Sequence, residues 1–462
     1  MATKKKIHFE ISERKILLRI LDVVSVLIAL FLVGNIFQFD YFNFTSDVGI
    51  WIVILTIYLS IFATIFELYD LQKASKLDVV VKNIILTTSL TVLFYLLTPF
   101  FTPTLPENRL QIIYFFISIA TALFLWRLAY ITLISSPRFY KRVLVVGDSF
   151  DIEHICSALQ KNDPNYVVVG FINTSDDAKD PIGNLKRFFG ENLEEIIKEN
   201  HIGEIVVSSS YNEGSMSPIY DQLIKLLKSG FPIREYNQVY EEVTHRIPVQ
   251  HMEKDFYKFF PFSRSNQNQL YLVYNRLFDI IFSLIGSLLG IVLIGFVFIG
   301  NFCGNRGNIF YRQERIGKNG QSFMIYKFRT MVKDAEIHGA QWAQENDLRV
   351  TKFGKFLRKT RLDEFPQFYN ILKGEMSFIG PRPERPMFVK ELTEIIPFYE
   401  VRHIVKPGLT GWAQVKTPYG SSFADSLRKL QYDLYYIKHR GVFLDYKIIM
   451  KTLSTIIFYR GQ

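Results

Sequence analysis

A stretch in the C-terminal third combines a helical pattern with two adjacent acids: Arg361-Leu-Asp-Glu-Phe-Pro-Gln-Phe-Tyr-Asn-Ile-Leu-Lys-Gly374. Its apolar residues recur at spacings of three and four, which predicts a helix over 362–373; they are Leu362, Phe365, Tyr369 and Leu372. Pro366 falls in the first turn, where a missing N–H does little harm, and Gly374 fits a C-terminal cap. Asp363 and Glu364 therefore lie at the N-terminal end, where the helix dipole stabilises ionised carboxylates.

The acid pair has two interpretations when it is taken alone. An ionised Asp363 flanked by Arg361 can serve as a nucleophile or as a ligand of Mg²⁺. Two acids at the start of a helix also commonly do no more than stabilise the helix through its dipole, and this structural role is the commoner one. The neighbouring segments provide the evidence that distinguishes the catalytic interpretation from the structural one.

Cations stand on both sides of this helix in the sequence. Lys327 and Arg329 alternate with an apolar residue in a predicted strand and so share one face, from which they could hold a diphosphate. A solvated charged face is the commoner explanation for such a pair. Arg382 stands between Pro381 and Pro383, and a guanidinium held in a rigid turn can bind phosphate bidentately.

A basic amphipathic segment precedes the acid pair. Phe353, Phe356 and Leu357 recur at helical spacing, and lysines and arginines surround them. Such a segment could lie in a bilayer interface and attract anionic lipid, or it could be an ordinary surface helix. Both interpretations stay open at this point.

Composition and charge exclude several classes of protein. The chain has 462 residues, 49% of them hydrophobic, and a positive mean hydropathy of +0.12, so it is not a disordered protein. Two cysteines provide neither a disulfide framework nor a cysteine-based zinc site. From residue 304 onward 27 Lys and Arg face 15 Asp and Glu, so the basic excess belongs to this region and suits an anionic partner.

Long apolar stretches open the chain, at residues 23–39, 48–66, 83–106 and 110–126. Each approaches the ~20 residues that cross a bilayer core, so we predict a bundle of four membrane helices over residues 1–138. Lysines and arginines concentrate before the first stretch, between the second and third, and after the fourth. This alternation predicts that both ends of the bundle lie in the cytoplasm.

An alternation of apolar β-branched runs and helical patterns follows, and it predicts a Rossmann-like parallel α/β domain over residues 139–245. Its first strand ends at Gly147, but the turn carries this one glycine, whereas a dinucleotide fingerprint needs three. We therefore expect no bound dinucleotide and predict no cofactor-binding residues here. Residues 246–270 are predicted to be a linker.

A fifth uncharged stretch, over 280–303, is long enough to span a membrane. Cations flank it on both sides, which suits a segment with two cytoplasmic ends. We therefore predict a re-entrant helix that enters the inner leaflet and returns. Because no proline lies in the stretch, Gly290 and Gly295 are the predicted sites of the break.

The C-terminal region resembles the bacterial polyprenyl-phosphate sugar-1-phosphate transferases, which are monotopic phosphoglycosyl transferases. The matching segments occur in order as RQERIG (312–317), YKFRTM (326–331), LDEFPQ (362–367), GEMSFIGPRPE (374–384), KPGLTGWAQV (406–415) and KLQYDLYYIKH (429–439). Four membrane segments and a Rossmann-like domain upstream resemble the large subfamily that starts exopolysaccharide repeat units, of the undecaprenyl-phosphate glucose phosphotransferase type. Family members commonly carry a Ser-Pro pair midway along the membrane helix, which this chain lacks.

The resemblance implies a two-step reaction. A UDP-sugar donates sugar-1-phosphate to undecaprenyl phosphate and UMP leaves, with Asp363 as the nucleophile and Glu364 as its partner in holding Mg²⁺ or handling protons. Lys327, Arg329, Arg361 and Arg382 match the cations expected near the phosphates. The residues agree with this, because two anionic substrates need cations, a metal and an ionised carboxylate.

The predicted organisation is thus a four-helix bundle, an α/β domain, a linker and, over 271–462, a re-entrant helix with an α/β catalytic domain. The expected partners are a UDP-sugar, undecaprenyl phosphate and the lipid of the inner membrane, with the catalytic domain on the cytoplasmic face and no nucleic acid bound. Self-association and the identity of the sugar stay open. The rival functions are a nucleotide-sugar epimerase or dehydratase and a non-enzymatic scaffold for polysaccharide assembly.

Overall fold

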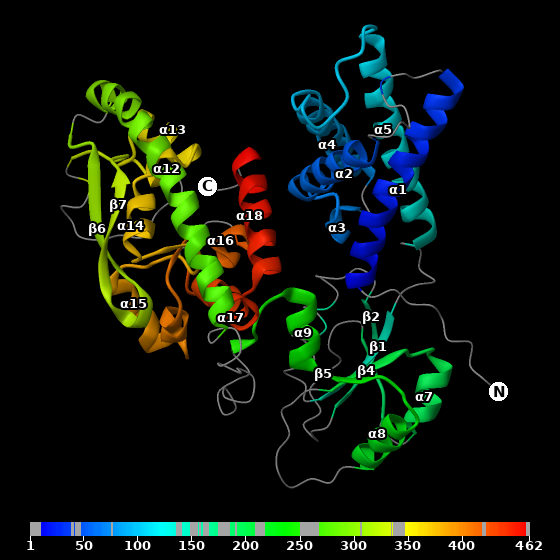
Figure 1. Ribbon diagram of the computed structural model, residues 1–462. Coiled ribbons are helices and arrows are strands. Elements are labelled where there is room, and N and C mark those ends of the chain that lie inside the picture. Colours follow the sequence, from blue (N-terminus) through cyan, green and yellow to red (C-terminus); the bar gives the residue numbers. More distant parts are fainter. Residues whose placement is uncertain are drawn as a thin grey trace. The chain divides into compact units, whose positions relative to one another are not determined.

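The computed structural model describes residues 11–37, 41, 48–74, 77–134, 141–147, 156, 159, 166–173, 185–189, 192–207, 218–249, 268–304, 307–333, 335, 347–417 and 422–458 (Figure 1). The chain divides into two compact units, Met1–Thr244 and His245–Gln462. We call them the N-terminal unit and the C-terminal unit, and we describe each by itself.

Apolar helices form the first part of the N-terminal unit. They are α1 (Ile11–Phe37), α2 (Val48–Ile65), the short α3 (Leu71–Ala74), α4 (Leu77–Leu96) and α5 (Leu110–Ala129), which continues into a π-helical turn, η2 (Tyr130–Ile134). Within this region α1, α4 and α5 are long and apolar enough to cross a membrane, and α2 is a shorter apolar helix. The prediction of four apolar helices is confirmed, and the protein is a membrane protein.

The bounds of two of these helices differ from the prediction. α1 begins at Ile11 rather than at residue 23, because a helix can continue past the apolar span into charged sequence. α4 begins at Leu77 and ends at Leu96 rather than covering 83–106. Pro99 and Pro103 follow its end, and a proline disfavours helical backbone in the residue before it.

A buried ion pair joins two helices of the bundle. Arg127 of α5 donates from Nη2 to Oδ2 of Asp22 in α1 at 2.7 Å, and both side chains are fully buried. Charges inside an apolar bundle persist when they are paired, so this contact specifies how α1 and α5 pack.

The second part of the N-terminal unit is a five-stranded parallel sheet in the order β3-β2-β1-β4-β5. Its elements are β1 (Lys141–Gly147), β2 (Tyr166–Asn173), β3 (Lys186–Arg187), α7 (Leu193–Glu199), β4 (Glu204–Val207), α8 (Pro218–Lys228), β5 (Ile233–Glu235) and α9 (Tyr236–Thr244). Val143 and Val145 face one apolar core, while Leu144 and Val146 face another. Successive side chains of a strand point to opposite faces, so a strand covered on both faces is apolar at every position. The predicted parallel α/β domain is confirmed, but the turn after Gly147 lies outside the described residues.

The C-terminal unit begins with one long helix and continues with short elements packed on it (Figure 1). They are α12 (Gln269–Gly304), β6 (Phe310–Ile316), η5 (Lys318–Gly320), β7 (Ser322–Phe328), α13 (Lys352–Lys359), η6 (Leu362–Glu364), α14 (Gln367–Lys373), β8 (Ser377–Ile379), α15 (Pro386–Ile395), η7 (Tyr399–Ile404), β9 (Gly408–Thr410), α16 (Trp412–Lys416), α17 (Phe423–His439) and α18 (Val442–Ile457). β6 and β7 form an antiparallel hairpin, and β8 pairs with β9 in parallel. The main core lies among α15, α17 and α18 around Trp412.

The predicted linker over 246–270 is partly incorporated into this unit. Ile247 and Val249 are buried in the core around Trp412, and the Ile247 N–H donates to Gln431 O at 3.1 Å. The indole of Trp412 donates to His245 O at 3.3 Å. A separate C-terminal unit therefore needs the chain from His245 onward, and residues 250–267 lie outside the described part.

Polar contacts anchor α12 to the short elements. Arg276 donates from its two terminal nitrogens to Ile371 O and Leu372 O, both at 2.8 Å, and so satisfies carbonyls at the C-terminal end of α14. Asp279 accepts from the N–H of Phe378 at 2.7 Å and from the hydroxyl of Ser377 at 3.0 Å. These bonds hold the N-terminal half of α12 against α14 and β8.

The helical backbone is not interrupted at Gly290 or Gly295, because α12 is one continuous α-helix of 36 residues, and a bend at these glycines stays a prediction. In Figure 1 the helix still changes direction along its course. Other glycines of α12 have a packing role. A Cβ at Gly300 would lie 2.1 Å from the ring of Phe353, and a Cβ at Gly286 would lie 2.5 Å from the ring of Phe368. The missing side chains allow aromatic rings to reach the helix backbone.

This packing predicts opposite effects for two alanine substitutions in one helix. Gly300→Ala should lower the free energy of unfolding by about 1–3 kcal/mol, since Phe353 has to leave its place on α12. Gly295→Ala should raise it by up to about 1 kcal/mol, because nothing lies within 4 Å of the added methyl group and alanine favours helix. Thermal unfolding of the detergent-solubilised protein measures both, and equal shifts would contradict the packing role.

Candidate active site

The acid pair lies in a tight turn between two helices. η6 carries Asp363 and Glu364, and the reversal from α13 into η6 places Arg361 in the left-handed region at φ 60°. The predicted helix over 362–373 is therefore a 3-10 turn followed by α14, with Pro366 at the helix start. Gly374 ends α14 at φ 90°, which confirms the predicted cap.

Three of the predicted cations meet at Glu364. Lys327 Nζ and Arg382 Nη2 each lie 3.0 Å from Glu364 Oε1, and Arg361 Nη1 lies 3.9 Å from Oε2. Lys327 comes from β7 and Arg382 from the loop after β8, so separate elements converge on one carboxylate. Arg329 is not among these contacts. It donates from Nε to Asn308 O at 2.9 Å and lies over the ring of Tyr311.

The pKa values of the two acids shift in opposite directions. Burial opposes the charge of Glu364, but Lys327, Arg382 and Arg361 outweigh it and hold its pKa well below the usual range. Burial, reinforced by the charge of Glu364, raises the pKa of Asp363 to about 6, and Lys327, Arg358 and Arg361 limit this rise. Among the described residues, Asp363 Oδ1 has no hydrogen-bond partner. Glu364 thus organises the cations, while the carboxylate of Asp363 stays available for a ligand or a reacting group.

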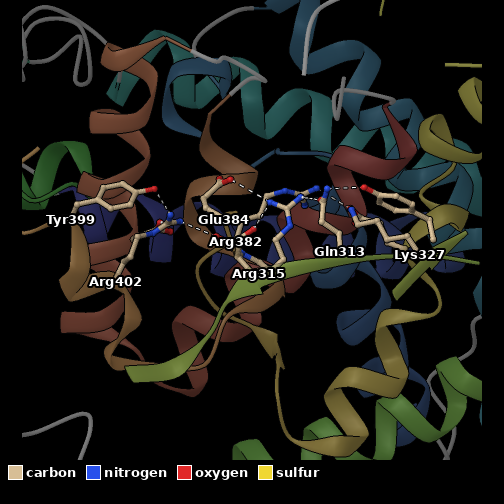
Figure 2. Close-up of polar contacts among 11 residues, drawn as sticks. Gln313, Arg315, Lys327, Arg382, Glu384, Tyr399 and Arg402 are labelled. Atoms are coloured by element: carbon tan, nitrogen blue, oxygen red, sulfur yellow. Dashed lines mark hydrogen bonds and ion pairs between the residues drawn. The ribbon is translucent and has the colours of Figure 1, made fainter. Parts of the chain in front are cut away.

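The loop that presents Arg382 is held through its main-chain carbonyls. Arg402 Nη2 donates to Arg382 O at 3.0 Å, Arg315 Nη1 to Pro383 O at 3.2 Å, and the N–H of Ile316 to Glu384 O at 2.9 Å. Figure 2 shows this row of side chains, with Tyr399 and Arg402 at one end and Lys327 at the other. The position of the Arg382 guanidinium therefore depends on groups outside the acid pair.

Arg402 is itself fixed by a buried partner. Its Nη2 lies 2.7 Å from Asp433 Oδ2 in α17, and its Nη1 donates to the hydroxyl of Tyr399 at 2.6 Å. Arg402 and Asp433 are almost fully buried. A charged pair in such a place is stable because each partner satisfies the other.

The two Pro/Gly-rich segments seen in the sequence pack against each other. The N–H of Gly380 donates to Thr410 O, and the N–H of Gly408 donates to Pro381 O, both at 2.9 Å. A Cβ at Gly380 would lie 2.4 Å from Lys406 O, so glycine is needed for this close approach. The segment 406–411 thus forms the support of the Arg382 loop.

Sequence reasoning missed the residues that connect these elements. Asn370 is fully buried; its side chain donates to Met324 O at 2.7 Å and accepts from the N–H of Tyr326 at 3.2 Å, which ties α14 to β7. Arg402 and Asp433 were missed as a pair, although Asp433 lies inside a segment that matched the family. An arginine and an aspartate inside apolar helical patterns could have indicated a buried pair.

The acid pair fits a shared metal ion only in part. No cluster of three or more His, Cys, Asp or Glu suited to a metal occurs among the described residues. Asp363 has an unpartnered, buried oxygen, which is a suitable ligand atom. Mg²⁺ commonly binds through one or two carboxylates and completes its coordination with water and substrate phosphates, so this pair suffices if a nucleotide is present.

His403 provides a pH-dependent contribution to stability. Burial, together with Arg402, lowers its pKa to about 4, whereas an unfolded histidine titrates near 6.5. The folded state therefore resists protonation, and the contribution is present above about pH 6.5 and is lost as the pH falls toward 4. Between pH 7 and pH 5 the free energy of unfolding should fall less in His403→Gln than in the wild type. Thermal unfolding at the two pH values measures this difference. Equal losses in the two proteins would contradict this prediction.

Two family models match parts of this chain. The family model described as bacterial sugar transferase matches residues 270–459, and one described as CoA-binding domain matches residues 64–226. The first match covers α12 from its second residue and all of the short elements after it, including the acid pair. The second extends from the end of α2 through α8 of the α/β sheet.

Curated relatives come from several bacteria. The chain is 40% identical over 236 residues to the UDP-N-acetylgalactosamine-undecaprenyl-phosphate N-acetylgalactosaminephosphotransferase of Aeromonas hydrophila, which covers 51% of this chain and 54% of the relative. It is 31% identical over 332 residues to the UDP-glucose:undecaprenyl-phosphate glucose-1-phosphate transferase of Xanthomonas campestris pv. campestris, covering 69% and 66%. It is 37% identical over 157 residues to the uncharacterised sugar transferase EpsL of Bacillus subtilis (strain 168), covering 33% and 72%.

The chain thus spans about half of the Aeromonas relative and most of the Bacillus one. The matched range of the family model, residues 270–459, includes the region in which the cations meet Glu364. The chain belongs to the bacterial sugar transferase family.

Proposed function

We propose that this protein transfers a sugar-1-phosphate from a UDP-sugar to undecaprenyl phosphate and releases UMP, as the first membrane step of exopolysaccharide or capsule synthesis. The observation that carries the proposal is the site itself, in which Asp363 stands beside an acid held by three cations and its buried Oδ1 has no hydrogen-bond partner among the described residues. The names of two relatives from Aeromonas and Xanthomonas describe this class of transfer.

In the proposed reaction the carboxylate of Asp363 attacks the phosphorus that bears the sugar. A bond forms between a carboxylate oxygen and this phosphorus, and the bond to the bridging oxygen breaks, so UMP leaves with the electron pair. A phosphate oxygen of the lipid then attacks the same phosphorus, the bond between this phosphorus and the Asp363 oxygen breaks, and the carboxylate of Asp363 leaves with the electron pair. Splitting the transfer into two displacements is the general advantage of a covalent intermediate.

The surrounding groups support this role for Asp363 rather than Glu364. Lys327 and Arg382 both lie 3.0 Å from Glu364 Oε1, so this oxygen is already engaged by cations. The same cations lie beside the place where a diphosphate would approach, and they stabilise charge that develops on its oxygens. Arg361 joins them, and Arg329 stays a proposed phosphate contact on the hairpin side.

We propose Mg²⁺ as the cofactor, held by Asp363 and Glu364 together with substrate phosphates. Bound there it would polarise the phosphate oxygens and neutralise their charge. The residues present a suitable donor set because Asp363 Oδ1 is buried and unpartnered among the described residues. The steps above are carried by the carboxylate and the neighbouring cations of this chain.

We propose that the C-terminal unit lies on the cytoplasmic face of the inner membrane, with both ends of α12 on that side. The short elements contact α12 at Arg276 and again at Gly300, 24 residues further on. This distance is about 36 Å along a helix, which exceeds the hydrocarbon thickness of roughly 30 Å. An upright crossing would therefore draw polar parts of the unit through the bilayer, whereas a helix that returns to its own side would not.

The test is a panel of UDP-sugars with undecaprenyl phosphate and Mg²⁺, in which UMP release from the purified protein is measured. We expect UMP release with at least one UDP-sugar. Continued, steady-state release should require undecaprenyl phosphate. Conversion of the UDP-sugar without the lipid and without UMP would favour the epimerase alternative. Absence of UMP with every sugar would favour the scaffold.

A further inference from the structure

A large cavity opens between the C-terminal half of α12, the β6–β7 hairpin and the start of α14. Its volume is about 1440 Å³, which exceeds the roughly 300–1,000 Å³ of a pocket for a compact small molecule. The polar contacts described above for the acid pair do not give this cavity a role. Its size suits a long ligand.

The walls of this cavity are largely apolar. α12 contributes Ile291, Ile294 and Phe298, the hairpin contributes Phe310 and Phe328, and α14 contributes Tyr369. Ile291 and Phe298 are exposed on the apolar surface of α12, so the cavity is continuous with a surface that suits lipid. Hydrocarbon that enters the cavity would remove the apolar side chains of its walls from water, which is favourable.

The lining carries one charge, the guanidinium of Arg312, and no acid. None of the described acidic side chains forms an ion pair with Arg312, which lies opposite Tyr326 in the hairpin. An apolar cavity with a single cation complements a molecule that has a hydrocarbon chain and an anionic head. A UDP-sugar matches this chemistry poorly, because it is polar over its whole length.

The cavity shares its walls with the elements that hold the acid pair. Phe365 and Pro366 line it and follow Asp363 and Glu364 directly in the chain. Tyr326 and Phe328 also line it and stand on either side of Lys327 in β7. A chain seated in the cavity would therefore lie next to the turn that carries the reacting carboxylate.

We propose that this cavity binds the isoprenoid units of the polyprenyl phosphate acceptor nearest its phosphate, with Arg312 as a cation for the acceptor head. The proposal rests on the proposed function and assigns the acceptor a binding site distinct from the cation cluster at Glu364. A two-chain membrane phospholipid is the alternative occupant. The position of the cavity beside the acid turn favours the acceptor.

The test compares two adjacent residues of α12. Ile291 lines the cavity and Val292 does not, although both are largely exposed apolar side chains. Ile291→Trp should fill part of the cavity and raise the KM for undecaprenyl phosphate by roughly tenfold or more. It should leave the KM for the UDP-sugar unchanged, and Val292→Trp should behave as the wild type.

A second pair of variants tests the head group. Arg312→Gln should raise the KM for the acceptor, and Arg312→Lys should restore most of the affinity, because it keeps the positive charge. Equal acceptor KM values in wild type, Ile291→Trp and Arg312→Gln would overturn the proposal.

Photo-cross-linking keeps the cavity testable if the proposed function fails and the wild type releases no UMP. A photoreactive polyprenyl phosphate should label peptides from 291–302 and 365–372 in the full-length protein, and unlabelled undecaprenyl phosphate should prevent the labelling. Labelling that phosphatidylglycerol vesicles prevent and undecaprenyl phosphate does not would assign the cavity to membrane lipid and overturn the proposal.

Discussion

Asp363→Asn should abolish sugar-phosphate transfer while leaving the fold intact. The amide has the shape of the carboxylate, but it has no charge and is a poor nucleophile toward phosphorus. We expect the rate of UMP release to fall by at least about a thousandfold, with the residual rate supplied by binding and electrostatic stabilisation alone. The structure should tolerate the change, since Asp363 Oδ1 has no hydrogen-bond partner among the described residues and the cations bind Glu364 instead.

The matched measurement is mass spectrometry of the protein incubated with donor and without acceptor. The wild type should carry a phosphosugar on the peptide that contains Asp363, and Asp363→Asn should carry none. Glu394→Gln, an acid-to-amide change at an exposed position of α15, should keep full activity. Near-normal turnover by Asp363→Asn would exclude the covalent mechanism.

Glu364→Gln is informative about the division of roles between the two acids. Lys327 and Arg382 each lie 3.0 Å from Glu364, and the substitution would remove the charge that gathers them. A nucleophile is lost outright in Asp363→Asn, whereas here the carboxylate of Asp363 remains. The sequence alone could not assign these roles, because two adjacent acids look alike until their partners are known.

The sequence predicted local features that depend on neighbouring residues. The cap at Gly374 follows from a conformation that glycine adopts readily, and the apolar helices follow from length and composition. The parallel sheet was predictable from the spacing of its β-branched runs. Such features need no knowledge of what packs against them.

Features that depend on a distant partner were not predictable in the same way. In the sequence Gly300 is a residue that disfavours helix. In the structure it lies inside a continuous helix, where the missing side chain leaves room for the ring of Phe353. Arg329 shares a strand pattern with Lys327, yet its contacts lie with Asn308 and Tyr311. The residues between 245 and 249 look like a linker because the core they enter comes from far along the chain.

The buried pair of Arg402 and Asp433 gives the second large effect. Asp433→Ala leaves a buried guanidinium without its counter-charge and should lower the free energy of unfolding of the C-terminal unit by about 3–5 kcal/mol. Lys373→Gln removes the exposed ion pair with Glu375 in the same unit and should change neither stability nor activity measurably. Loss of stability alone, however, would not separate a structural role from a positioning role.

The double variant Arg402→Met, Asp433→Leu makes that separation. Apolar residues of similar size can replace a buried ion pair with little cost, so the double variant should regain most of the stability that Asp433→Ala loses. It still lacks the hydrogen bond from Arg402 to Arg382 O, which is 3.0 Å long in the wild type. The Arg382 loop then has one anchor fewer, and a hydrogen bond from a charged group contributes about 1.5–3 kcal/mol. We therefore expect kcat/KM to fall by roughly ten- to a hundredfold at near-normal thermal stability. Recovery of stability together with full activity would show that Arg402 supports the fold and does not position Arg382.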